Sequence, residues 1–183
     1  IRPGLVRFHG KTNIKPEPGT YTTLMAGRYM TTGIDISRSK DIYLKDLTIY
    51  HALSHGVFGR TTENITMDNA SMRTNDQKGR VFSIIADASH FQNCRGKIKV
   101  INCAHTGAMD DFINVQGGYT KIDSIAGPST VLVSRDRGIG FAGDEIWFVN
   151  PVLCQRSDAF TVKSVERTGD GRNPVILVTF DQP

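Results

Sequence analysis

Two adjacent carboxylates, Asp110 and Asp111, are the first candidates for chemistry, because they run into the apolar segment Phe112-Ile-Asn-Val115. Asp is disfavoured in β-strands, and neighbouring carboxylates repel each other. This repulsion lets one carboxyl group keep its proton while the other is ionised, which places an acid and a base at one site. A solvated turn after Thr106-Gly107 would also account for the pair, so the surrounding residues have to decide between the two interpretations.

A third carboxylate, Asp87, precedes Asp110 by 110 − 87 = 23 residues. If the chain returned to the same place every 23 residues, the three carboxylates would form one cluster. Clustered carboxylates suit either the general acid and base of glycosidic bond cleavage or a Ca²⁺ site. Calcium favours more oxygen ligands in loops dense in Asp, Asn and Gly, whereas these Asp residues have apolar neighbours. Acid and base chemistry is therefore the better interpretation, and no metal is predicted.

The elements that must position these residues show a repeat of that length. Three segments superpose as apolar-x-apolar-x-(Asp/Asn), and they begin at Ile42, Ile65 and Ile98. The steps are 65 − 42 = 23 and 98 − 65 = 33 residues, the second being one step with an insertion. A short strand that recurs in this way is typical of a solenoid, whose stacked copies bury one continuous column of side chains. Alternation predicts the inward pairs: Ile42 and Leu44, Ile65 and Met67, and Ile98 and Val100.

We therefore predict an all-β fold, with a right-handed parallel β-helix over residues 1–119 that carries the three Asp residues. An antiparallel sandwich of short strands is the alternative, but Asn-Gly or Asp-Gly hairpin turns are missing between the repeats. Asn69 and Asn102 occupy the polar position of the repeat and are interpreted as turn or ladder residues. The open ends of so short a solenoid would expose backbone and apolar side chains, which further coils or an oligomer would cover.

Residues 120–183 have a different pattern, in which short strands are separated by Gly-rich or charged turns and share no repeat. They predict a small antiparallel β-barrel or sandwich appended to the solenoid, with Trp147 and Phe148 in or near its core. The expected strands are Thr130–Ser134, Asp144–Val149, Phe160–Val165 and Pro174–Phe180.

The composition fits one domain with a small appendage, at 183 residues and 20.2 kDa. The formal charge is +4, but the basic residues are scattered, so nucleic-acid binding is not predicted. No apolar stretch reaches the roughly 18 residues of a membrane span, and the first residues do not match a signal peptide. Cys94, Cys103 and Cys154 match neither a metal motif nor a disulfide framework, so they are expected to be buried free thiols.

The segments around the carboxylates resemble glycoside hydrolase family 110, exo-acting α-1,3-galactosidases that remove terminal galactose from blood group B type glycans. The resemblance rests on Ala86-Asp-Ala-Ser-His-Phe91 together with Asp110-Asp-Phe-Ile-Asn-Val115. It extends upstream to Gly33-Ile-Asp-Ile-Ser-Arg38 and downstream to Phe141-Ala-Gly-Asp-Glu-Ile-Trp147, so it covers nearly the whole chain. Enzymes of this family are longer, so the chain resembles a fragment of one.

This resemblance implies an inverting, metal-independent α-galactosidase that needs no cofactor and acts on a glycan with terminal α-galactose. Carried over by position, Asp110 would be the general acid, while Asp87 and Asp111 would hold and deprotonate the attacking water. In an inverting enzyme the acid and the base are expected roughly 6.5 to 9.5 Å apart. The family also implies a bacterial enzyme that is secreted or periplasmic.

Five polar residues near the carboxylates are candidates for substrate binding, and two of them, Arg80 and His90, could instead orient a carboxylate. Where the family pattern has Asn-x-His-Gly, this chain has Asn-x-Gln-Gly, so Gln116 stands in place of a His. Gln can replace the hydrogen bond of a His, but it cannot titrate near neutrality. Tyr119 is expected either to stack on a sugar or to pack in the core. The five candidates are His90, Arg80, Asn114, Gln116 and His55.

Two other functions stay open. A polygalacturonase-like hydrolase would share the carboxylates, but it would need an open groove with basic residues for uronate groups. A non-catalytic carbohydrate-binding solenoid would share the repeat, but it would have no use for three convergent carboxylates. The discriminating observation is whether Asp87, Asp110 and Asp111 approach one another on an outer face.

Overall fold

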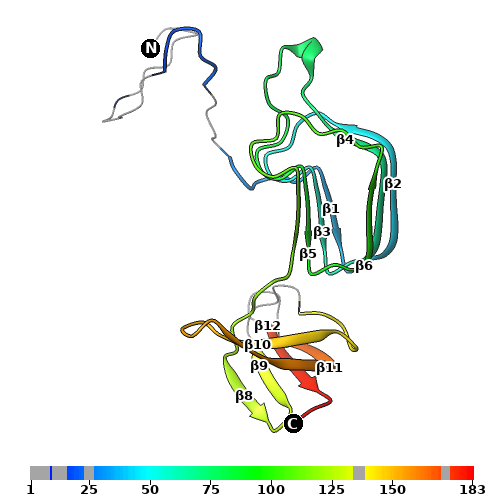
Figure 1. Cartoon of the computed structure of the whole chain (residues 1–183), viewed down its shortest axis with the longest axis vertical. Coiled ribbons are helices and arrows are strands. Elements are labelled where there is room, and N and C mark those ends of the chain that lie inside the picture. Colours follow the sequence, from blue (N-terminus) through cyan, green and yellow to red (C-terminus); the bar gives the residue numbers. More distant parts are fainter. Residues whose placement is uncertain (1–8, 10–15, 23–26, 134–138, 170–173) are drawn as a thin grey trace.

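The computed structural model describes residues 9, 16–22, 27–133, 139–169 and 174–183. Nearly all regular structure in these residues is β, as predicted. The sole helix among them is the single 3₁₀ turn η1 (Asp76–Lys78), so no described helix is long enough to cross a membrane. Figure 1 shows a part built from parallel strands and, later in the chain, a part built from antiparallel strands.

Consecutive strands of the first part alternate between two parallel sheets. The order is β1-β3-β5-β7 in the first parallel sheet and β2-β4-β6 in the second. The chain therefore returns to each sheet beside the strand it left, and stacked strands come from successive repeats. The first sheet holds β1 (Ile34–Ser37), β3 (Val57–Arg60), β5 (Ser89–Gln92) and β7 (Ile113–Gln116), and the second holds β2 (Lys40–Ile49), β4 (Glu63–Met72) and β6 (Arg95–Ile101).

The strands of the second sheet pair in the register that the repeat predicts. Their pairing is parallel, which excludes the antiparallel sandwich for these strands. Ile65 and Met67 are fully buried, because a fixed alternation and a fixed step together specify which side chains face inward. The Cα partners are Ile42, Ile65 and Ile98 in one row and Leu44, Met67 and Val100 in the other.

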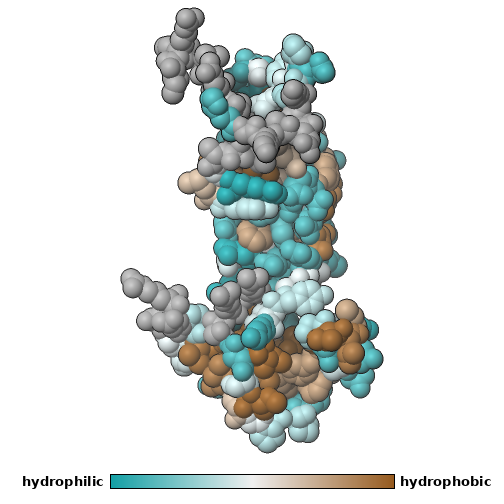
Figure 2. Space-filling model, turned by 90° about the vertical axis from the view of Figure 1, so that its left-hand side faces the viewer, coloured by the Kyte–Doolittle hydropathy of each residue, from teal (hydrophilic) through white to brown (hydrophobic). Residues whose placement is uncertain are grey.

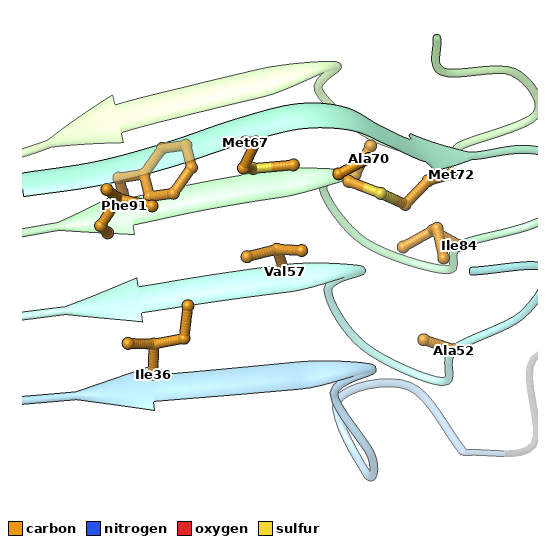
Figure 3. Packing of buried hydrophobic residues seen from close by; sticks show 10 residues of the cluster. Ile36, Ala52, Val57, Met67, Ala70, Met72, Ile84 and Phe91 are labelled. Carbon is orange, nitrogen blue, oxygen red and sulfur yellow. The ribbon is translucent and has the colours of Figure 1, made fainter. Parts of the chain in front are cut away.

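A single core fills the space between the two parallel sheets. Figure 3 shows Ile36, Val57 and Phe91, from β1, β3 and β5, gathered with Met67 and Met72 of β4. All of these except Ile36 have no exposed surface, and Ile36 lies near the end of the stack with 8% exposed. Because the inward side chains are buried in this core, the outward side chains of the same strands are available to form a site.

Asn residues mark the bends of the second sheet, as interpreted from the repeat. Asn69 has φ +51° and donates from its amide to Asp46 at 2.8 Å, which itself has φ +50°. Asn102 has φ +54° and donates to Asp68 at 3.1 Å. Asn and Asp tolerate the left-handed region better than other side chains, so they allow the strand to bend at the same place in each repeat.

The second part is a five-stranded antiparallel sheet with the order β10-β11-β12-β9-β8. Among the described strands, the edge strands β8 and β10 do not pair with each other, so the sheet is open rather than closed into the predicted barrel. Its own core gathers six buried residues, including Val162, Ile176 and Phe180. The strands are β8 (Ser124–Gly127), β9 (Thr130–Val133), β10 (Glu145–Asn150), β11 (Gln155–Gly169) and β12 (Pro174–Phe180).

Two aromatic expectations are resolved by the alternation of β10. Phe148 packs against the antiparallel core and makes an edge contact with Phe160, with ring centroids 4.9 Å apart. Trp147 points the other way and is 44% exposed, under the guanidinium group of Arg156. Tyr119 is exposed, so it does not pack in the core.

Arg95 joins the two parts. It lies on β6 and pairs with Glu63 of β4 at 2.9 Å and with Asp144, just before β10, at 3.1 Å. Its guanidinium group also lies 4.5 Å from the ring centroid of Phe141. A bridged cation with two carboxylates and a ring restrains the antiparallel sheet against the edge of the parallel part.

The cysteine expectation is confirmed only in part. Cys94, Cys103 and Cys154 are all free thiols. Cys94 and Cys103 are half-buried and Cys154 is exposed, so none of them is a fully buried thiol.

Gly56 permits the close stacking of the turns that lead into the first parallel sheet. A Cβ atom there would lie 2.5 Å from the carbonyl oxygen of Ala88 and 2.6 Å from Cγ of Met72. The backbone N–H of Gly56 donates to the carbonyl of Asp87 at 3.1 Å, so the turn of one repeat directly supports the turn of the next.

Replacing Gly56 by Ala is expected to lower the free energy of unfolding by about 1–3 kcal/mol, because a methyl group would overlap a backbone carbonyl that has no space to move. Gly117→Ala is the matched control, since its Cβ would meet nothing within 4 Å. Urea or thermal unfolding of both variants measures the difference. Equal stability of the two variants would contradict the close packing of these turns.

Candidate active site

Asp87 is the buried centre of the site. It lies in the turn before β5 and is only 5% exposed. Its Oδ2 atom accepts a hydrogen bond of 2.6 Å from Nδ1 of His90 and one of 3.3 Å from the side-chain amide of Asn114. A buried carboxylate requires such donors, so these two residues fix both the position and the orientation of Asp87.

The outer face of the first parallel sheet aligns the partners of Asp87. Phe58, His90 and Asn114 are Cα partners across β3, β5 and β7, so their side chains form one row. Gln116 lies two residues beyond Asn114 and its Nε2 is 2.8 Å from Nε2 of His90. Since an amide nitrogen only donates, His90 accepts at Nε2 and carries its proton at Nδ1, facing Asp87.

His55 faces the same carboxylate from the preceding repeat. Its Nδ1 lies 3.6 Å from Oδ2 of Asp87, which is too long for a hydrogen bond, and this buried nitrogen has no partner among the described residues. The His55 ring packs against Phe58 and His90, with ring centroids 4.8 and 4.7 Å away. Burial lowers the pKa of His55, and the neighbouring His90 lowers this pKa further.

Asp110 and Asp111 lie in an irregular segment rather than in a strand, which explains how both can reach one place. Gly107 has φ +67°, and the segment stays irregular until β7 begins at Ile113. The predicted bend at this glycine is therefore present. Carboxylate oxygens of Asp87, Asp110 and Asp111 all lie within 4.8 Å of one another, with Asp87 buried and the other two exposed.

Arg28 and Tyr29 reach the site from the chain that precedes β1. Arg28 pairs with Asp110 at 2.9 Å, and its guanidinium group lies over the ring of Tyr29. Tyr29 in turn is 6.0 Å from His55 between ring centroids, and it is largely exposed. The sequence analysis missed both residues, because they lie outside the repeat and only the fold brings them to the carboxylates.

Arg80 is a predicted site residue that, among the described residues, contacts neither the carboxylates nor the other residues of the site. It is exposed, and its backbone N–H donates to the carbonyl of Asn75 in the loop around η1. Within the described part of the chain, its side chain makes no hydrogen bond or ion pair. Arg80 is close to Asp87 in the sequence, but the loop that follows β4 and η1 keeps it from contacting Asp87.

The face that carries the first parallel sheet is mostly hydrophilic, whereas the antiparallel part shows hydrophobic side chains on the same side (Figure 2). Polar surface over the sheet suits a ligand rich in hydroxyl groups. Two overlapping sets of residues there have the ligand types and spacing for a cation, and Asp87 belongs to both. They are Asp87, Asp110 and Asp111, and His55, Asp87 and His90.

Two histidines whose pKa values are lowered, buried His55 and half-buried His105, predict an acid-sensitive fold. The pKa values of His55 and His105 are lowered mainly by burial. The unfolded chain therefore binds protons that the folded chain resists, so the free energy of unfolding falls as pH falls below about 6.5, by at most about 1.4 kcal/mol per pH unit for each His. Urea unfolding between pH 5 and 7 measures this slope.

His105→Leu is expected to flatten part of that slope, since it removes one of the two histidines whose pKa is lowered. His51→Leu is the control, because it removes an exposed His. A slope that His105→Leu leaves unchanged would show that His105 does not contribute to it.

Known proteins were found to be similar to this chain, although no family model matches it. The chain is 31% identical to "Alpha-1,3-galactosidase A" of Bacteroides fragilis over 188 aligned residues, which cover 100% of the chain and 31% of that relative. It is 37% identical to "Alpha-1,3-galactosidase B" of Phocaeicola vulgatus over 146 residues, 76% of the chain and 24% of the relative. It is 32% identical to "Alpha-1,3-galactosidase A" of Shewanella woodyi over 131 residues, 72% of the chain and 22% of the relative.

The chain thus spans 31% of the length of the Bacteroides fragilis relative, which fits the expectation of a fragment. The similarity runs through both the parallel and the antiparallel parts, since it covers the whole chain. The resemblance carried by the segments around Asp87 and Asp110 is confirmed: the chain belongs to the family of the alpha-1,3-galactosidases.

Proposed function

We propose that this chain carries the catalytic centre of a glycoside hydrolase of family 110 that removes terminal α-1,3-linked galactose from glycans, including those of blood group B type. The observation that supports this most directly is the convergence of Asp87, Asp110 and Asp111 to within 4.8 Å on an outer face. A carbohydrate-binding solenoid has no need of three carboxylates in one place, whereas glycosidic bond cleavage needs an acid and a base.

The different surroundings of the three carboxylates support a division of roles. Asp110 is exposed and reaches Arg28, so it is free to approach a glycosidic oxygen, and we assign it the role of general acid. Asp87 is buried and held by His90 and Asn114, so it is fixed as an acceptor. With Asp111 it would hold and deprotonate the attacking water.

The other polar residues divide into two kinds. His90, Asn114 and Gln116 contact Asp87 or one another, so we assign them to positioning Asp87 rather than to binding the sugar. Arg28 and Tyr29 line the exposed side of the carboxylates, where a guanidinium group and an aromatic face suit sugar hydroxyls and an apolar sugar face. His55 supports the rings of Phe58 and His90.

The spacing of the carboxylates sets a condition on the stereochemistry. Retaining glycosidases hold the two carboxyl groups about 5–5.5 Å apart, and inverting ones roughly 6.5–9.5 Å apart. The nearest oxygens of this cluster lie within 4.8 Å, which is short for a water molecule between acid and base. We propose that the enzyme inverts the configuration. The bound sugar would displace Arg28 from Asp110 and separate the exposed Asp110 from the fixed Asp87, which makes room for the water.

Hydrolysis of α-1,3-linked galactosides by the longest natural form of the protein, followed by proton NMR, tests the function and the stereochemistry together. The expected first product is β-galactose, which then mutarotates. α-Galactose as the first product would exclude inversion while leaving the galactosidase intact. Hydrolysis of polygalacturonate instead of galactosides would replace the proposed substrate with a uronate polymer.

We also infer that the alternating parallel sheets are faces of a right-handed β-helix that continues in the longer relatives. The strand β7 is the edge of the first sheet, and its inward positions Ile113 and Val115 are exposed there. A further coil would cover them. Because glycans with terminal galactose are found on cell surfaces and in secretions, we propose a secreted or periplasmic location for the bacterial enzyme.

A further inference from the structure

Two imidazoles converge on one buried carboxylate oxygen. Nδ1 of His90 lies 2.6 Å from Oδ2 of Asp87, and Nδ1 of His55 lies 3.6 Å from the same oxygen. All three residues are buried: His90 is 8% exposed, His55 is 9% exposed and Asp87 is 5% exposed. One ligand atom of each lies within 4.8 Å of the other two, so the three can meet around a single small ion.

One buried ring nitrogen of these three residues makes no hydrogen bond with the described residues. His90 satisfies both of its ring nitrogens, through Asp87 and Gln116. Nδ1 of His55 is buried and has no hydrogen-bond partner among the described residues, although it points at Asp87. A buried nitrogen left without a partner requires an explanation, and an ion bound between it and the carboxylate would supply one.

We propose that His55, Asp87 and His90 form a binding site for a divalent transition-metal ion, with Zn²⁺ as the preferred ion. Zinc takes imidazole nitrogen at about 2.0–2.1 Å and carboxylate oxygen at about 2.0–2.2 Å, so tetrahedral ligand atoms stand roughly 3.3–3.5 Å apart. The 3.6 Å between His55 and Asp87 is close to that separation. The ion replaces the His90–Asp87 hydrogen bond, and the two groups separate to admit it.

Proton positions give Gln116 a role in this exchange. Without metal, His90 carries its proton at Nδ1 and accepts from the amide of Gln116 at Nε2. With metal on Nδ1, the proton of the neutral ring moves to Nε2, and no net proton is released. Gln116 then has to turn its amide and offer its oxygen, as an outer partner of a metal-bound His usually does.

Zinc at this site would occupy one oxygen of Asp87 and make the carboxylate a weaker base. The binding itself does not depend on the proposed function. If that function holds, however, zinc is expected to inhibit galactoside hydrolysis by occupying the carboxylate that activates water. Mg²⁺ and Ca²⁺ prefer oxygen ligands and are expected to bind this site far more weakly than Zn²⁺.

Calorimetric titration of the chain with Zn²⁺ in a non-chelating buffer at pH 7 is expected to show one tight site. His55→Phe should weaken that site by roughly tenfold or more, and His51→Phe, a matched change at an exposed His, should leave it unchanged. Asp110→Asn removes a nearby charge but no ligand of the proposed site, so it should weaken zinc binding much less than His55→Phe does. Thermal unfolding confirms that each variant is folded.

Variants of Gln116 separate this site from adventitious zinc. Gln116→Glu offers a stronger acceptor to the Nε2 proton of metal-bound His90 and should tighten binding, whereas Gln116→Leu should weaken it about tenfold. On the unaltered chain, ¹⁵N spectra of the imidazoles should show zinc shifting the signals of His55 and His90 but not that of His51, which requires no substitution.

Absence of one-site zinc binding, or equal affinity in His55→Phe and His51→Phe, overturns the proposal. Unshifted His55 and His90 signals overturn it independently of whether the variants fold. Zinc binding with these signatures in a protein that hydrolyses no galactoside upholds this site and removes the proposed function instead, so the two failures are distinguishable.

Discussion

Replacing Asp110 by Asn is expected to lower kcat/KM by about 10²–10⁴-fold on galactosides whose leaving group is another sugar. A sugar alkoxide departs poorly unless it is protonated, and Asn cannot supply the proton. An activated aryl galactoside departs without such help, so its loss should be much smaller. The ratio of the two losses is therefore the measure of general acid catalysis.

The fold should tolerate this change, because Asp110 is exposed and its pairing with Arg28 is a surface ion pair of about 0–1 kcal/mol. Arg28→Ala is the matched control, since it removes the same ion pair but keeps the acid. Steady-state kinetics of both variants on both substrates decides the assignment. Equal losses on the two substrates in Asp110→Asn would show that Asp110 is not the acid.

The parallel part could be predicted from the sequence because its signals are local and periodic. The step from Ile42 to Ile65, with alternation inside each copy, specified both the pairing and the inward side chains, and the structure has that register. Asp87 does lie close to Asp110, although the strands that follow them pair with a step of 24 residues, from Ser89 to Ile113. A period is sufficient for this, since each repeat contacts its neighbours in the same way.

Residues outside the period could not be placed in the same way. Arg28 and Tyr29 reach the carboxylates from a segment with no repeat, and no pattern in the sequence marks them. Arg80 is close to Asp87 in sequence but lies in the exposed loop around η1. In the antiparallel part, four of the five strands were predicted, but β8 and the open strand order were not, because pairing between distant strands leaves no local signal.

The direction of hydrogen bonds was also beyond the sequence. His90 was expected either to bind sugar hydroxyls or to orient a carboxylate, and Asn114 and Gln116 were expected to bind the substrate. In the structure without a ligand, the contacts of these residues go to Asp87 and to each other. The alternation of β5 and β7 places His90 and Asn114 on the outer face. The hydrogen-bond partners of these two residues depend on the conformation of the turn that carries Asp87, and secondary-structure propensities do not predict that conformation.

Replacing Asp87 by Asn is expected to depress hydrolysis by about 10²–10⁴-fold on sugar and aryl galactosides alike, because water attack is impaired whichever group departs. The amide keeps the shape of the carboxylate, and its oxygen still accepts from His90 and Asn114. The loss of charge weakens these two bonds, so the free energy of unfolding should fall by only about 1–2 kcal/mol.

Asp87→Ala provides the contrast in stability, since it leaves both buried donors unpaired and adds a cavity. Its free energy of unfolding should fall by about 1–3 kcal/mol more than that of Asp87→Asn. Once its activity is corrected for the fraction of folded protein, it should equal the activity of Asp87→Asn. Kinetics on both substrates and urea unfolding of both variants separate the two roles of Asp87. A larger loss on the sugar leaving group than on the aryl one would transfer the acid role from Asp110 to Asp87, because only a proton donor is sensitive to what departs.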